Sequence, residues 1–178
     1  MAITHLGTVT GSGTPSTLSF TSIPDTYASL IIRGVGYTTG AGPEDVYLQF
    51  NSTSTANNDG NRGGRFTGAN LAYQEENTSF AQCAEVPGYD MATGGQIVTQ
   101  LEMDLVSYRG DQPGNITWHA QGCYMYGTST SPSGMCNFQF TGWYDAAPTV
   151  DVATITLRMS SNNWGANSVF DLYGRPDE

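Results

Sequence analysis

Basic residues are scarce in this sequence. It contains no lysine and only six arginines, against 16 aspartates and glutamates, so that the formal net charge is −10 at pH 7. Sequence-independent binding of nucleic acid depends on basic side chains that release counterions from the phosphates. Attraction to anionic lipid headgroups depends on the same side chains. We therefore expect neither a nucleic acid nor a membrane among the partners.

Long apolar runs and targeting signals are also lacking. No apolar run approaches the length of about 20 residues that a transmembrane helix needs. The first residues lack the basic and apolar regions of a signal peptide, so we expect the chain to stay in the cytosol after synthesis. Cysteine occurs only at Cys83, Cys123 and Cys136. An odd number of cysteines in that compartment favours reduced thiols over a disulfide framework.

One cysteine pairing remains geometrically open. If the turn between the strands that hold Cys123 and Cys136 centres on Ser129 and Thr130, the two cysteines lie directly opposite each other. Opposed strand residues are often poorly angled for a disulfide. Free, buried cysteines are therefore the favoured interpretation, and a disulfide is the alternative.

Helical periodicity is almost absent, whereas a two-residue alternation recurs along the chain. Val46, Leu48 and Phe50 point one way and the polar residues between them point the other way, as in a half-buried strand. Two further alternating strands lie between Val150 and Gly174 around a polar turn. The other segments with strand character are residues 5–10, 17–23, 27–36, 71–75, 97–105, 115–126 and 135–144.

These patterns predict an all-β fold. About nine or ten strands without an amphipathic helix or an internal repeat favour a single-domain antiparallel β-sandwich with a jelly-roll-like arrangement. We expect one domain over residues 1–178, with a long loop-rich insertion at about 51–94. Within this insertion only the segment at 71–75 has a weak strand pattern.

Candidate metal ligands are few. His119 lies on the polar face of its strand and His5 is nearly terminal, and neither has partners at the spacing of a zinc site. The segment Asn57 to Asn61 resembles a calcium loop, but the sixth position is Arg62 and the twelfth is Gly68, where an EF-hand has Gly and Glu. We expect no metal or cofactor, while a looser calcium site of the lectin type remains open.

A pair of carboxylates gives the strongest hint of catalysis. Glu102 and Asp104 share one face of a strand and lie about 7 Å apart at Cα, a spacing that could suit a glycoside hydrolase. No aromatic pocket that would raise the pKa of one of them can be identified from the sequence. An outward-facing polar stripe is the favoured interpretation, and we expect the protein not to be an enzyme.

Three blocks at the two ends of the chain carry a family resemblance. They are LGTVTGSGTPSTLSFTSIPDTYASLIIRG at 6–34, VYLQFN at 46–51 and ATITLRMSSNNWGANSVFDLYG at 153–174, together about 60 of the 178 residues. In this order they resemble a family of tailed-phage virion proteins with small jelly-roll-like β domains. The resemblance implies a non-enzymatic structural protein: a capsid cement or decoration protein, a head fibre, or a domain of a tail fibre. Such proteins act as oligomers, often trimers.

The sequence departs from the family pattern in its loops. After Phe50 and Asn51 the family commonly turns through a glycine-containing loop, whereas here residues 52–55 read Ser-Thr-Ser-Thr, and the chain continues beyond Gly174. Residues 56–95 carry no resemblance. Because partner choice usually resides in loops, no binding residue can be transferred from the family.

We expect a cement protein on the capsid exterior, assembled in the host cytoplasm, that bridges and stabilises capsid subunits. Its partners would be the major capsid protein and other copies of itself, as a homotrimer. Arg62 and Arg65, in the loop expected at 51–70, are candidates to pair with carboxylates of the shell; ordinary solvated charge is the simpler interpretation. The alternative function is a receptor- or glycan-binding module of a fibre or tail.

Overall fold

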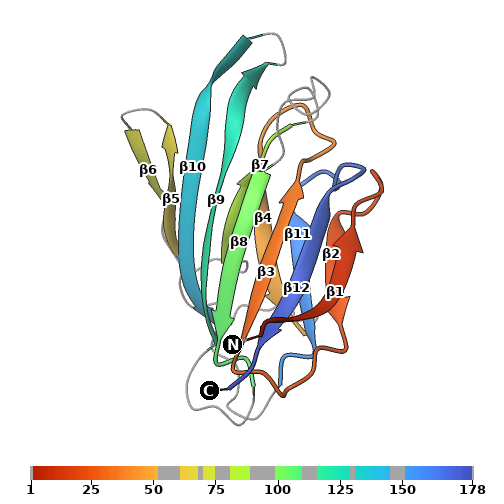
Figure 1. Ribbon diagram of the computed structural model, residues 1–178. Coiled ribbons are helices and arrows are strands. Elements are labelled where there is room, and N and C mark those ends of the chain that lie inside the picture. The colour runs from red at the N-terminus through yellow and green to blue at the C-terminus, as the bar shows by residue number, and fades with distance from the viewer. Residues whose placement is uncertain are drawn as a thin grey trace.

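The computed structural model describes most of the chain. The described residues are 2–51, 61–67, 70–74, 81–88, 99–109, 116–128, 131–144 and 151–177, without the side chains of 61–67, 70–74, 81, 125–128 and 131–134. All regular structure in these residues is β-strand (Figure 1). A helix that could cross a membrane does not occur in them.

Twelve strands are formed by the described residues, two or three more than the sequence predicts. They are β1 (Thr4–Thr10), β2 (Thr17–Thr21), β3 (Ser29–Gly36), β4 (Glu44–Phe50), β5 (Asn61–Thr67), β6 (Asn70–Gln74), β7 (Ala81–Val86), β8 (Thr99–Val106), β9 (Ile116–Thr128), β10 (Ser131–Tyr144), β11 (Thr154–Met159) and β12 (Val169–Arg175).

The strands form two antiparallel sheets with jelly-roll connections. The smaller sheet has the order β2-β11-β4-β7, and half of the larger sheet has the order β1-β12-β3-β8. The chain alternates between these two sets of strands, from β1 to β2, β3 and β4 and again from β7 to β8, β11 and β12. Alternation with this strand order is the double Greek key of a jelly roll. The predicted all-β sandwich of jelly-roll type is therefore confirmed.

Two hairpins widen the larger sheet beyond the jelly roll. β5 and β6 lie in the connection from β4 to β7, and β9 and β10 lie in the connection from β8 to β11. All four strands continue the larger sheet past β8 in the order β9-β10-β5-β6, which gives it eight strands (Figure 1).

The prediction for residues 51–94 is wrong in part. β6 lies close to the weak strand expected at 71–75, but β5 and β7 occupy segments that were expected to be loop. β5 has the sequence NRGGRFT, whose adjacent glycines and charges give no strand signal. Pairing with β10 over seven register pairs holds this segment in the sheet. The segment has little strand propensity of its own.

The core lies between the sheets and follows the predicted alternation. Val46, Leu48 and Phe50 are at most 1% exposed, and so are the inward residues Ile155, Leu157 and Met159 of the C-terminal pair. Burial of this kind stabilises the folded state by about 1.5–3 kcal/mol for each large apolar side chain.

Asn51, the last residue of the second family-like block, stands at a position that favours asparagine. Its backbone has a positive φ of 51°, a conformation that asparagine tolerates better than most residues. Its side-chain amide donates to the carbonyl of Asp151 at 2.8 Å, and its Oδ1 accepts from the backbone N–H of Ala153 at 2.8 Å and of Thr154 at 3.1 Å. Asn51 thus ties the end of β4 to the start of β11.

The geometry of the β9–β10 hairpin excludes a disulfide between Cys123 and Cys136. The pairs Ser131 with Thr128 and Pro132 with Gly127 follow the symmetric register that the sequence predicts, but an irregularity between Pro132 and Gly134 shifts all later pairs by one residue. Cys136 therefore pairs with Tyr124. A shift by one residue moves a side chain to the other face of the sheet, so Cys136 is buried while Cys123 lies on the outside; all three cysteines are free.

Candidate binding face on the larger sheet

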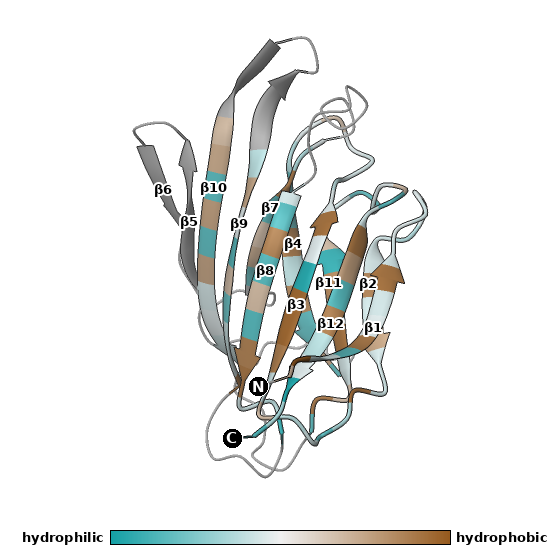
Figure 2. Ribbon diagram, in the orientation of Figure 1, coloured by the Kyte–Doolittle hydropathy of each residue, from teal (hydrophilic) through white to brown (hydrophobic). Residues whose placement is uncertain are grey.

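The outer face of the eight-stranded sheet, which is turned away from the smaller sheet, is the most distinctive surface in the described part of the chain. Among the described side chains, five large hydrophobic ones are exposed, and four of them belong to this face: Val35, Val106, Met135 and Trp143. Polar and apolar residues alternate along its strands (Figure 2), so that most of the other outward side chains are polar. Exposed apolar side chains among polar ones are typical of a binding surface.

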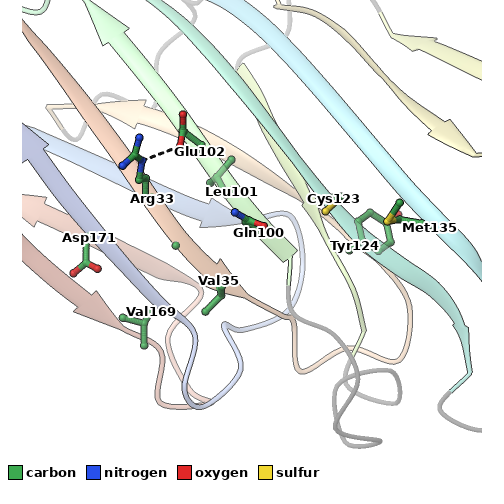
Figure 3. Close-up of a pocket in the computed structure, with 11 residues that line it drawn as sticks. Arg33, Val35, Gln100, Leu101, Glu102, Cys123, Tyr124, Met135, Val169 and Asp171 are labelled. Carbon is green, nitrogen blue, oxygen red and sulfur yellow. Dashed lines mark ion pairs between the residues drawn. The ribbon is translucent and has the colours of Figure 1, made fainter.

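Two adjoining depressions form what we call the trough. The first has a volume of about 610 Å³ and the second of about 410 Å³. They share Gln100, Glu102 and Cys123, so they are continuous across β8 and β9. Figure 3 shows the first depression, with β12 and β3 on one side and β8, β9 and β10 on the other. Side chains of the first depression include Arg33, Val35, Met135, Val169 and Asp171, and those of the second include Gln121, Asn137 and Gln139.

The floor of the trough depends on two glycines. A Cβ at Gly34 would collide with the ring of Phe170, and a Cβ at Gly122 would collide with the ring of Phe138 and the carbonyl oxygen of Gln100. Glycine at both positions lets these core phenylalanines cross directly beneath the sheet backbone.

An ion pair crosses the middle of the trough. Arg33 on β3 and Glu102 on β8 are register partners, and Nε of the guanidinium lies 2.8 Å from Oε2 of the carboxylate (Figure 3). Both side chains are substantially exposed, at 51% and 38%, so the pair contributes at most about 1 kcal/mol to stability. Its main effect is to fix the direction of both side chains.

Asp171 at the edge of the trough has its own partners. Its Oδ1 accepts a hydrogen bond of 2.5 Å from the hydroxyl of Thr8 and lies 3.2 Å from Nε2 of His5. The hydrogen bond from Thr8, with a smaller contribution from His5, lowers the pKa of this carboxyl from its ordinary value of 3.8. Asp171 is therefore ionised near neutral pH, and its Oδ1 is already hydrogen-bonded to Thr8 and His5.

Amide side chains occupy the β8–β10 side of the trough. Gln100, Gln121 and Asn137 are exposed, and the structure gives their side chains no hydrogen bond to a described residue. Gln139 is engaged, because its Nε2 lies 2.8 Å from Nε2 of His119.

A second feature, which we call the Trp143 step, lies further along the same face. Val106, Thr117 and Trp143 are aligned across β8, β9 and β10 by the strand register. Val106 is 43% exposed and Trp143 is 42% exposed. They border a depression of about 360 Å³ that also includes His119 and Thr141. An exposed tryptophan, with an exposed valine two strands away, is the kind of apolar anchor that protein interfaces use.

The carboxylates singled out by the sequence do share the outer face, as predicted. Glu102 is paired with Arg33, and Asp104 lies with Oδ1 3.6 Å from Nη2 of Arg175. His119 on the same face is half-buried and hydrogen-bonded to Gln139. Within the described residues, no group of three or more His, Cys, Asp or Glu side chains is placed to hold a metal ion.

The arginines proposed as partner contacts lie in a strand. Arg62 and Arg65 belong to β5, paired with Thr141 and Phe138 of β10, so the expected loop position is wrong. Their side chains lie outside the described residues, and so does most of the calcium-like segment, residues 57–60. The contacts predicted for these residues stay predictions.

Sequence reasoning missed the trough. Its residues come from β3, β8, β9, β10 and β12, and no single segment carries enough of them to form a motif. The available signal was the alternation in residues 100–106 and 116–124, whose polar members lie on the outer face. Which strands stand next to each other cannot be read from that alternation.

Comparisons with known proteins give distant similarities only. No family model matches the sequence, and no curated protein matches it. One solved structure similar to this fold is "CG-16, a homodimeric agglutinin from chicken liver", with 8% identity and a TM-score of 0.33 over 86% of this chain and 98% of that chain.

A second similar structure is the tripod (BppUct-A-L) from the baseplate of bacteriophage Tuc2009, with 10% identity and a TM-score of 0.27; the match covers 95% of this chain and 62% of that chain. A third, the catalytic domain of PdAgaC, has 6% identity and a TM-score of 0.20 over 96% of this chain and 75% of that chain. One of these proteins thus belongs to a phage particle and another is an agglutinin. At such TM-scores the similarities carry no argument about function.

Proposed function

We propose that this chain is a structural protein of a tailed-phage particle, specifically a cement protein on the capsid exterior that binds the major capsid protein and bridges its subunits. The proposal starts from the three family-like blocks of the sequence. Those blocks fall on β1, β2, β3, β4, β11 and β12, the strands that make up most of the jelly roll. They account for the scaffold, so contacts with the shell must come from surfaces outside them.

The Trp143 step is the observation that supports the proposal best. It lies on β8, β9 and β10, strands that the family-like blocks do not include. A tryptophan that is 42% exposed on a sheet face leaves a large apolar surface in water. Covering that surface with a capsid subunit would provide a docking anchor of the type that dominates interface energies.

The protein would bridge capsid subunits if it is a homotrimer. Three copies of the Trp143 step would then face three capsid subunits at once, and the attachment strength would grow through avidity without a tight single site. Reinforcement of the shell would come from added interface area. No chemical step is required of the protein.

The carboxylate pair fits a structural role. Glu102 is paired with Arg33 on the adjacent strand β3, and Asp104 is paired with Arg175 on β12, which lies beyond β3. Both ion pairs restrain the direction of the carboxylates. We expect Glu102→Gln and Asp104→Asn to leave docking to the shell unchanged and to abolish no hydrolytic activity. Loss of a hydrolytic activity in either variant would overturn the structural interpretation.

The docking experiment uses particles of the encoding phage that lack this protein. Purified wild-type chain should bind them in many copies per shell, whereas Trp143→Ala should lose at least about tenfold in affinity through loss of the anchor. Ile3→Ala is the matched control, because Ile3 is 46% exposed and directly precedes β1, an edge strand that is far from β10 in the strand order of the larger sheet. Equal binding by all three proteins would contradict a docking role for the step.

The alternative is a receptor- or glycan-binding module of a fibre or tail, and the trough amides that have no hydrogen bond to a described residue favour it. Copy number separates the two functions. A cement protein should be present in hundreds of copies over the shell, whereas a module at a fibre tip should be present in a handful at the tail.

A further inference from the structure

The trough has two sides of different chemistry. On the side of β12 and β3, the register partners Val169 and Val35 present aliphatic surface. On the side of β8 to β10, the amides of Gln100, Gln121 and Asn137 stand on adjacent strands. A ligand that fits both sides must have an apolar face and several hydrogen-bonding groups.

The charged groups of the trough are already engaged. The carboxylate of Glu102 is bound to Arg33, and that of Asp171 to Thr8 and His5. Besides the Nη donors of Arg33, the groups left to bind a ligand are neutral amides, each of which can both donate and accept hydrogen bonds. Sugar hydroxyls have the same double capacity, and the C–H face of a sugar ring is apolar.

We propose that the trough binds an uncharged oligosaccharide. The amides of Gln100, Gln121 and Asn137 hydrogen-bond its hydroxyls, and Val35 and Val169 pack against an apolar ring face. The volumes of the two depressions, about 610 and 410 Å³, fall in the usual range for small-molecule sites. Their continuity gives room for more than one sugar ring.

Charge and backbone pairing disfavour other occupants. The charge of Arg33 is already balanced by Glu102, so an anionic ligand would meet the unbalanced carboxylate of Asp171 on a chain with a net charge of −10. An extended peptide gains its affinity by adding to a sheet edge, whereas the strands under the trough are hydrogen-bonded to neighbours on both sides. A neutral, hydroxyl-rich ligand meets neither obstacle.

The site is separate from the proposed shell contact. On β8, Val106 of the Trp143 step follows Gln100 by six residues and Glu102, which also lines the trough, by four. These spacings correspond to roughly 20 and 13 Å along the strand. Shell docking and sugar binding can therefore occur together. On a particle with many copies, even a weak site would hold a glycan-coated surface firmly through avidity.

The test applies purified full-length protein to an array of neutral, sialylated and sulfated oligosaccharides. Wild-type protein should bind neutral members, and Gln121→Ala and Asn137→Ala should each weaken binding about fivefold to tenfold, as the loss of one or two hydrogen bonds predicts. Gln49→Ala is the matched control, because Gln49 is a strand glutamine of the smaller sheet; it should bind like wild type. Bound oligosaccharide should also slow alkylation of Cys123, which lines both depressions.

Three results would overturn the proposal: no binding to any neutral oligosaccharide, preference for the acidic ones, or equal affinity in the trough variants and the control. Trp143→Ala distinguishes this proposal from the cement function. We expect that variant to keep its sugar binding while it loses shell docking, so each idea can fail without the other.

Discussion

Tyr124 on β9 donates its phenolic hydrogen to the carboxylate of Glu85 on β7, and this buried hydrogen bond joins the two sheets. The side chains are only 2% and 5% exposed. Burial, together with the neighbouring carboxylate, raises the pKa of Tyr124 far above its ordinary value of 10.0. The bond lies where the added strands of the larger sheet meet the jelly roll, so it fixes the position of the β9–β10 hairpin.

Removal of this hydroxyl should destabilise the fold. In Tyr124→Phe a buried carboxylate loses a donor, which costs about 1–3 kcal/mol of unfolding free energy. Tyr27→Phe is the control, because the structure gives the Tyr27 hydroxyl no hydrogen bond to a described residue, and it should change stability by less than about 0.5 kcal/mol. Urea unfolding of both variants measures the difference. Equal stability would mean that the bond does not hold the sheets together.

Stability should fall in alkaline solution. Burial raises the pKa of the Cys83 thiol well above its ordinary value of 9.0, so the native state keeps a proton that the unfolded state loses. A group with a raised native pKa stabilises the fold fully below its unfolded pKa, and the contribution declines as the pH rises beyond that value. The decline should begin near pH 9 and steepen above pH 10, where tyrosines such as Tyr124 add to it.

Cys83→Ala isolates the thiol's share of this effect. The variant is expected to be less stable than the wild type at neutral pH because it leaves a small cavity. Between pH 9 and 11 its unfolding free energy should fall less steeply than that of the wild type, and the two slopes should differ by up to about 1.4 kcal/mol per pH unit. Parallel pH profiles for the variant and the wild type would rule out this origin.

The glycine floor of the trough can be tested by adding one methyl group. Gly122→Ala pushes a Cβ into the ring of Phe138 and the carbonyl oxygen of Gln100, and overpacking of this kind costs about 1–3 kcal/mol. Gly42→Ala, whose Cβ meets nothing within 4 Å, should be neutral or slightly stabilising. Thermal unfolding compares the two; a neutral Gly122→Ala would show that the sheet can yield at this position.

Thiol reactivity follows from the shifted register of β10. In native protein, iodoacetamide should modify Cys123 first, while Cys83 and Cys136, both 0% exposed, should react only after unfolding. Peptide mass spectrometry should find all three thiols free. A Cys123–Cys136 disulfide, or fast labelling of Cys136, would mean that the irregularity at Pro132 to Gly134 is absent.

The jelly roll was predictable because its strands carry strong local signals. Alternation in β4 and β11 identifies their buried faces, and the unbroken apolar run of Leu30, Ile31 and Ile32 identifies a strand covered on both faces; all three residues are at most 1% exposed. Periodicity reports directly on burial, so the fold class follows from it.

The hairpin details and the candidate site could not be predicted, since both depend on long-range pairing. A one-residue irregularity at Pro132 to Gly134 decides which face of the sheet Cys136 occupies, and the composition of the turn does not predict this irregularity. β5 is a strand because β10 pairs with it. The trough exists because β12, β3 and β8 are neighbours in the sheet although far apart in sequence.

A cryo-EM map of the intact particle tests the central claim most directly. The account predicts density for this jelly roll, with its eight-stranded sheet, repeated over the capsid exterior, with Trp143 against the major capsid protein and the trough open to solvent. Density for the protein at the tail alone, or shell contacts that leave Trp143 exposed, would contradict it.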